Sequence, residues 1–252
     1  MKGLIWKNFI QTMAAIAFLV IVWLVAYIRV GNDLLVPPIS DSLKEMGALF
    51  VKGAFWRALG GTLWRSILAF MISFAFALIF AVVAYLYPAF GRFFAPIASV
   101  LRSMPILAIL LILLTFLNAA QAPIAVAFLS LFPMLYTGVL AALSGVDRHL
   151  IDVSRVYGTP VWRRVTAIYI PLSAPYILKE GAAALSFALK LIVSAEVLAY
   201  TARSLGGMMQ EANVYAERPQ LFALVMVSFV VGLVLETAIG ALASAVEKRV
   251  KR

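Results

Sequence analysis

The sequence predicts an all-α membrane protein with about six transmembrane helices and both termini in the cytoplasm. Apolar residues make up 64% of the 252 residues and charged residues only 13%, against about a half and a quarter in ordinary globular proteins. The mean hydropathy is +1.02. Residues 66–91 and 103–146 carry no charge at all, and about 20 apolar residues are enough to span a bilayer. These observations exclude an ordinary soluble domain.

The expected spans follow from the length of each apolar run and from the turn residues that close it. The uncharged run 103–146 is too long for one helix, and Asn118, Gln121 and Pro123 divide it. The six expected spans are 9–28, 66–87, 95–117, 123–143, 176–200 and 221–245. No repeat or linker separates them, so residues 1–252 are expected to form a single membrane domain.

The segment 31–65 is polar enough to leave the hydrocarbon region, yet it keeps large aromatic residues. Trp56 and Trp64 stand there among Lys52 and Arg57. Such a pattern is typical of an interfacial amphipathic helix, which would lead into the second span. A plain outer loop is the alternative.

The basic residues indicate how the chain is oriented. With the N-terminus inside, 13 of the 21 Lys and Arg residues fall in inner segments and seven in outer ones, in line with the positive-inside rule. The net charge of +10 is spread between apolar segments, which indicates contact with the lipid bilayer rather than with nucleic acid. There is no cysteine and one histidine, His149, so we expect no metal site. The dispersed acids suggest no catalytic residues.

The longest expected inner connection is the loop 144–173. Within it, Asp147–Tyr157 carries apolar residues at helical spacing, and Gly158 can end that helix in the left-handed conformation. A loop longer than a simple turn calls for a structural or functional reason.

A second short helix is expected directly after Gly158. Thr159 is a suitable N-cap and Pro160 a suitable first-turn residue. Arg163 and Arg164 lie on one face of this helix, and Pro171 is expected to end it. The two helices either present a surface for a partner protein or lie against lipid headgroups.

The loop resembles the cytoplasmic signature of permease subunits of binding-protein-dependent ABC importers. That signature runs Glu-Ala-Ala, three residues, Gly, nine residues, and then Ile-x-Leu-Pro. Here Gly158 is followed after nine residues by Ile168, Tyr169, Ile170 and Pro171. Asp152, Val153 and Ser154 stand at the Glu-Ala-Ala positions. The spacing matches, while the first half of the signature is degenerate.

Further short matches favour the nitrate, sulfonate, taurine and bicarbonate group of these permeases. Arg102-Ser103-Met104-Pro105 is similar to the group's Arg-Ser-x-Pro segment. Its Ala-Glu and Leu-Gly segments resemble Ser194–Val197 and Ser204–Gly207. Pro37-Pro38, after the first span, is similar as well.

The resemblance implies a type I ABC importer-like permease fold with a cytoplasmic coupling helix, in a bacterial or archaeal inner membrane. Two permeases, expected to be two copies of this chain, would form the pathway above two ATPase subunits. ATP and Mg²⁺ would bind to the ATPase, and no cofactor to this chain. A binding protein outside the membrane would deliver a small anion or an organic nutrient. The chain has no Gly-x-x-x-x-Gly-Lys-Ser/Thr loop, so it is not expected to be an enzyme that hydrolyses ATP.

The resemblance also implies which residues couple the permease to the ATPase. They all lie in the loop 144–173. They are Asp152, Val153, Ser154, Arg155, Gly158, Thr159, Arg163, Arg164, Ile168 and Pro171.

Polar residues inside the spans are candidates for the translocation pathway, because a charge in hydrocarbon needs a partner or water. Lys190 falls near the middle of the fifth span, and Ser186 and Ser194 lie four residues to either side. This polar stripe either offers a positive charge to an anionic substrate or pairs Lys190 with Glu196 or Glu236.

Two further charged residues have competing interpretations. Glu196 either pairs with Arg203 or serves as a gate or a contact to the binding protein. Arg102 is expected near the inner surface, where it either reaches lipid headgroups or forms part of an inner gate.

Two other functions remain open at this point. An ion-coupled secondary carrier would use Lys190 and Glu196 as its own coupling groups, although such carriers commonly show inverted repeats. A membrane scaffold would use the inner loop only to hold a soluble protein.

Overall fold

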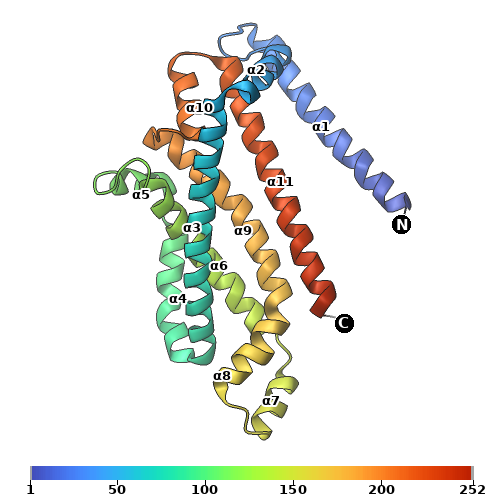
Figure 1. Cartoon of the computed structure of the whole chain (residues 1–252), viewed down its shortest axis with the longest axis vertical. Coiled ribbons are helices and arrows are strands. Elements are labelled where there is room, and N and C mark those ends of the chain that lie inside the picture. Colours follow the sequence, from blue (N-terminus) through green and yellow to red (C-terminus); the bar gives the residue numbers. More distant parts are fainter. Residues whose placement is uncertain (1, 251–252) are drawn as a thin grey trace.

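The computed structural model describes residues 2–250, and all the regular structure in that range is helical. Figure 1 shows an elongated bundle with α7 and α8 at one end and α2 and α10 at the other. The elements are α1 (Lys2–Val30), α2 (Ile39–Val51), α3 (Gly53–Leu86), α4 (Pro88–Ser103), α5 (Ile106–Leu113), α6 (Ala122–Ser144), α7 (Arg148–Val156), α8 (Val161–Arg164), the π-helix η1 (Val165–Tyr169), α9 (Ile170–Ala199), α10 (Leu205–Val214) and α11 (Arg218–Val250).

The centre of the bundle is formed by α3, α6 and α9, which pack against one another. From Thr62 onward the buried residues of α3 are small and recur every three or four positions: Thr62, Ser66, Ala69, Ser73, Ala77, Ala81 and Ala84. Small residues let helices approach closely within a membrane, where packing rather than water exclusion drives association. Aromatic rings fill the wider space between α3, α4 and α6, with Phe80, Phe94 and Phe132 in mutual contact.

Five helices of the described chain are long and apolar enough to cross a membrane, and a bent pair of helices brings the number to six. This confirms the predicted all-α membrane fold. In Figure 1, α1 leans away from the bundle, and both α1 and α11 direct their chain-terminal ends away from α2 and α10.

The expected straight helix over 95–117 is wrong. It is replaced by α4 and α5, which meet at an angle of 90°. The break falls at Met104 and Pro105, both of which have extended backbone conformations. Proline disfavours helical geometry in the residue before it, so the chain turns there although both flanking segments are apolar.

This break also changes the expected position of Arg102. Helix α4 starts directly after α3 and packs back along it. Since Arg102 is 14 residues beyond Pro88, it lies about 21 Å along α4. Its exposed side chain therefore lies well along the bundle from the turn between α3 and α4.

Helix α3 begins at Gly53, 13 residues before the expected second span, and so takes in the last 13 residues of the segment 31–65. The amphipathic part of that segment is α2, which the extended Lys52 separates from α3. Arg65 does not end the helix, because the bundle supplies a buried partner for it.

Proline does not separate the inner loop from the fifth span, contrary to the expectation for Pro171. The chain is helical from Val161 to Ala199. The π-helix η1 widens the backbone ahead of Pro171, and the N–H of Ile170 bonds to the carbonyl of Val165. Pro171 follows directly on this wider turn, which accommodates a ring that has no N–H to donate.

Candidate functional site

The inner loop projects from one end of the bundle as two helices joined by a fixed turn. At the start of α7, the Asp147 carboxylate accepts a hydrogen bond from the backbone N–H of His149 at 2.9 Å. At its end, Gly158 has φ +65°. The N–H of Gly158 bonds to the carbonyl of Arg155 at 2.9 Å, and that of Thr159 to the carbonyl of Ser154 at 3.0 Å. These paired bonds form a Schellman motif, as the position of Gly158 predicted.

The start of α8 differs from the expectation. Its N-cap position is Pro160, and no side chain caps the helix, so Thr159 does not act as the expected N-cap. The extended backbone of Pro160 (φ −59°, ψ 148°) leads directly into the helix. The backbone N–H of Thr159 is already bonded to the carbonyl of Ser154, at the end of the preceding helix α7.

The signature residues fall on both faces of this loop. Ser154 is buried, and its Oγ donates to the carbonyl of Ile151 at 2.6 Å. Asp152 and Arg155 form an exposed ion pair of 3.6 Å. Val153 and Arg163 are exposed, whereas Thr159, Arg164, Ile168 and Pro171 are half-buried. The structure thus brings the expected coupling residues together in one loop. The buried and half-buried ones lie within the fold of the loop, and the exposed ones form its surface.

The loop also carries an exposed apolar surface that the sequence analysis did not single out. Val156, Tyr157 and Trp162 are 85%, 83% and 76% exposed, and we call these three residues the apolar tip. They surround the turn at Gly158. Exposed apolar groups of this size, gathered in one place, mark contact surfaces for a partner. The sequence did not reveal this surface, because Val156 and Tyr157 belong to the apolar helical pattern of 147–157 and are not distinguished there from the buried Ile151.

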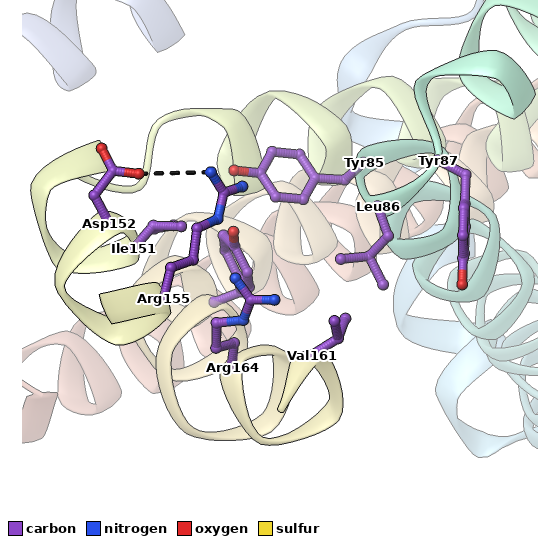
Figure 2. A pocket seen from close by; sticks show the side chains of 9 residues that line it. Tyr85, Leu86, Tyr87, Ile151, Asp152, Arg155, Val161 and Arg164 are labelled. Atoms are coloured by element: carbon purple, nitrogen blue, oxygen red, sulfur yellow. Dashed lines mark ion pairs between the residues drawn. The ribbon is translucent and has the colours of Figure 1, made fainter. Parts of the chain in front are cut away.

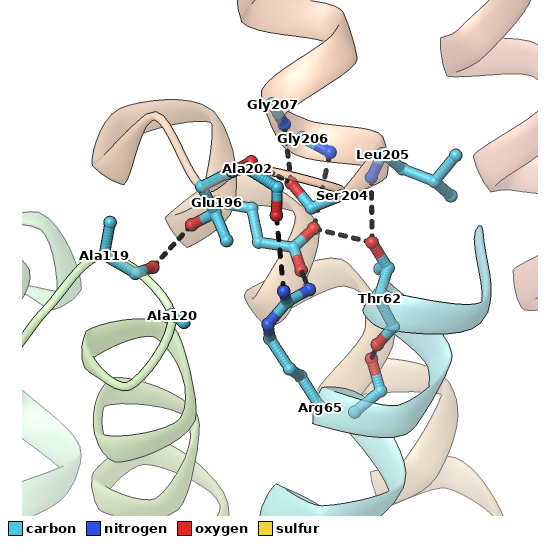
Figure 3. A network of polar contacts seen from close by, with 12 residues as sticks. Thr62, Arg65, Ala119, Ala120, Glu196, Ala202, Ser204, Leu205, Gly206 and Gly207 are labelled. Atoms are coloured by element: carbon cyan, nitrogen blue, oxygen red, sulfur yellow. Dashed lines mark hydrogen bonds and ion pairs between the residues drawn. The ribbon is translucent and has the colours of Figure 1, made fainter. Parts of the chain in front are cut away.

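A second constellation lies near the opposite end of the bundle and is shown in Figure 3. The fully buried carboxylate of Glu196 accepts hydrogen bonds from Arg65 and from Thr62, each at 2.8 Å, and from the backbone N–H of Gly206 at 3.3 Å. The Thr62 hydroxyl in turn accepts from the N–H of Leu205 at 2.9 Å. We call Thr62, Arg65, Glu196 and Gly206 the polar clamp.

The polar clamp fastens α3, α9 and α10 to one another. Only glycine fits at position 206, because a Cβ there would approach the carbonyl of Val193 to 2.6 Å. The adjoining turn is held as well, since the Thr201 hydroxyl donates to the carbonyl of Ala119 at 2.6 Å. The pair expected between Glu196 and Arg203 is therefore wrong: Arg65, from a distant part of the chain, takes the place of Arg203.

The polar stripe of α9 lines a groove between α9, α10 and α11. Lys190, Ser186, Ser194 and Glu236 all border this groove, whose volume is about 320 Å³. Ser186 is buried and donates to Glu236 at 3.3 Å. Lys190 is exposed, and no carboxylate among the described side chains lies within ion-pair distance of it. The expected pairing with Glu196 or Glu236 is absent there.

Comparison with known proteins identifies the family. Residues 73–252 match the family model described as "Binding-protein-dependent transport system inner membrane component". The chain belongs to this family. It is therefore a multi-pass membrane protein and a transport permease subunit, as the signature loop predicted.

Curated relatives agree with this assignment. The taurine transport system permease protein TauC of Escherichia coli K12 is 24% identical over 239 residues, which cover 92% of this chain and 86% of the relative. A probable ABC transporter permease protein of Brucella melitensis is 26% identical over 197 residues, covering 78% of this chain and 80% of the relative.

Solved structures show the same fold. A bacterial ABC transporter involved in alginate import superposes with a TM-score of 0.69 at 17% identity, over 96% of this chain and 98% of that one. The MetNI methionine ABC transporter gives a TM-score of 0.63 at 19% identity, over 80% of this chain and 97% of that one. These likenesses confirm the predicted fold.

Proposed function

We propose that this chain is the membrane subunit of an ATP-driven importer, and that a separate ATPase subunit docks on the α7–α8 loop. Family membership together with the apolar tip of Val156, Tyr157 and Trp162 carries the proposal. ATP and Mg²⁺ bind to the ATPase and not to this chain. The loop and both termini then lie in the cytoplasm.

Helical continuity supports a mechanical role for the loop. Because helix runs from Val161 to Ala199, a displacement of α8 is passed to α9 through η1. The Schellman motif at Gly158 keeps α7 and α8 in a fixed relation, so that the two helices move together. In this way closure of the ATPase around ATP changes the position of α9 in the membrane.

The pathway runs along one exposed face of α9, between two copies of this chain. Exposed residues on α9 recur at intervals of three and four: Leu172, Tyr176, Lys179, Ala183, Phe187, Lys190, Ser194 and Leu198. The remaining faces of α9 pack against α3, α6, α10 and α11. A face that carries Lys179 and Lys190 suits water or a substrate better than lipid.

The substrate is a small anion or an organic nutrient delivered by a binding protein outside the membrane. The unpaired ammonium group of Lys190 supports an anionic group on the substrate. The similarity to a taurine permease supports a sulfonate as that group.

Affinity purification of the tagged chain from its own host tests this function. The expected result is a complex of two permease and two ATPase chains, identified by intact mass and peptide sequencing. Recovery of the chain alone, folded and active in proton- or sodium-driven uptake, would overturn the importer and establish the ion-coupled carrier.

A further inference from the structure

A hollow of about 540 Å³ separates the α7–α8 loop from the end of α3. Figure 2 shows its wall, which Tyr85, Leu86 and Tyr87 form on one side and α7 and α8 on the other. The hollow contains charged groups from both loop helices: Asp152 and Arg155 from α7, and Arg164 from α8.

Arg164 carries a donor that lacks an acceptor in the described part of the chain. Its Nε is buried, and no hydrogen-bond partner for this atom exists among the described residues. A buried N–H without an acceptor destabilises the protein, and more so when the group is charged. Figure 2 shows the guanidinium groups of Arg155 and Arg164 both directed into the hollow. An acceptor placed between them would lie within reach of both guanidinium groups.

The charge balance of the hollow favours an anion. Two guanidinium groups face one carboxylate, that of Asp152, which lies 3.6 Å from Arg155. Both side chains of this pair are largely exposed, and exposed pairs of this kind contribute little to stability. An oxyanion can therefore draw Arg155 away from Asp152 at little cost, and guanidinium groups bind phosphate through paired N–H donors.

The position of the hollow suggests where the anion comes from. It adjoins the last turn of a membrane-spanning helix, at Tyr85 and Tyr87, and tyrosine is enriched at the level of the lipid headgroups. Apart from its buried residues Ile151 and Ser154, α7 has few contacts with other helices. A ligand in the hollow would join α7 to α3.

We propose that this hollow is a phosphate-binding site, filled by the headgroup of an anionic phospholipid or by soluble phosphate, with Arg155 and Arg164 as its ligands. The bound phosphate fastens α7 to the end of α3 and so fixes the α7–α8 loop on the bundle. An effect on transport rests on the proposed function, whereas the binding of phosphate does not.

Amide hydrogen exchange of the full chain in lipid nanodiscs tests the site. We expect phosphatidylglycerol, added to phosphatidylcholine nanodiscs, to slow exchange in residues 148–156 at least about tenfold, the effect of one charge-assisted contact. Arg164→Gln should reduce the slowing to less than about twofold. Arg163→Gln is the matched control, because it removes the same charge from an exposed neighbour outside the hollow, and should keep the full slowing.

A second arm distinguishes the two sources of phosphate. Millimolar inorganic phosphate is added to nanodiscs of phosphatidylcholine alone. If it slows exchange in residues 148–156, soluble phosphate fills the site; if only phosphatidylglycerol does so, the lipid headgroup fills it.

Two results would overturn the site. One is unchanged exchange with both probes, which would leave the hollow to an acidic side chain of the ATPase. The other is an equal loss of slowing in Arg163→Gln and Arg164→Gln, which would mean general surface charge. Should Arg164→Gln alter exchange in the α3 core, Arg155→Gln replaces it, with the same expected loss. None of these results depends on whether an ATPase binds, so the site and the proposed function can fail separately.

Discussion

Removing Arg65 from the polar clamp should destabilise the protein strongly. Glu196 is fully buried and accepts hydrogen bonds from Arg65, Thr62 and Gly206. Arg65→Leu leaves the carboxylate buried without a cation, and breaking such a pair costs about 3–5 kcal/mol. Because Thr62 and Gly206 still donate to the carboxylate, we expect about 3 kcal/mol, at the lower end of that range.

The assay is reversible unfolding in mixed micelles by increasing dodecyl sulfate, with the free energy of unfolding taken from the helical signal. Arg57→Leu is the control, because Arg57 lies exposed on the same helix and its loss should change stability by less than about 0.5 kcal/mol.

A double-mutant cycle isolates the interaction itself. Arg65→Leu combined with Glu196→Leu removes both charges, so the double variant should be more stable than the sum of the single losses by about 2 kcal/mol. An Arg65→Leu variant within about 1 kcal/mol of the wild type, or strictly additive losses, would show that the clamp does not hold α3, α9 and α10 together.

Three further predictions concern the loop and the pathway. Gly158→Val should strain the left-handed turn by about 1–3 kcal/mol and lower the amount of substrate transported per ATP hydrolysed. Gly158→Asn should retain most of the wild-type ratio of transport to hydrolysis, because asparagine tolerates the left-handed conformation. Equal ratios for the two variants would contradict a role for the Schellman turn. Trp162→Ala should weaken binding of the purified ATPase by about 2 kcal/mol, measured by surface plasmon resonance, without lowering the melting temperature. Tyr215→Ala should have no effect, because Tyr215 is exposed and directly follows α10, at the other end of the bundle. Lys190→Met should lower uptake into proteoliposomes at least about tenfold, while ATPase activity in detergent is retained; unchanged uptake would remove Lys190 from the pathway.

The sequence was informative where the structure depends on local geometry. Gly158 was predicted to be left-handed because the helical pattern before it stops there, and its φ is +65°. The break at Pro105 carried the same kind of local signal in Met104-Pro105. It was missed because the apolar run continues across it, and apolar length measures burial in lipid but not helix direction.

Tertiary partners were beyond the reach of local patterns. Helical spacing offered Arg203 as the partner of Glu196, because both fall on one face of a continued helix. The helix in fact ends at Ala199, with Tyr200 left-handed, so Arg203 leaves that face. The actual partner, Arg65, is 131 residues away in the sequence. Arg65 stands at the edge of an uncharged run, and this position suggested a residue at the membrane–water interface and not one in a buried ion pair.

The docking of an ATPase on the α7–α8 loop is tested most directly by site-specific cross-linking. The chain contains no cysteine, so a single substitution gives a unique attachment point. Tyr157→Cys places it on the apolar tip, and Tyr215→Cys places it at the opposite end of the bundle. In membranes of the native host, Tyr157→Cys should cross-link to an ATPase subunit and Tyr215→Cys should not. Cross-linking of the ATPase through Tyr215→Cys, or of no ATPase through Tyr157→Cys, would contradict the proposed role of the loop.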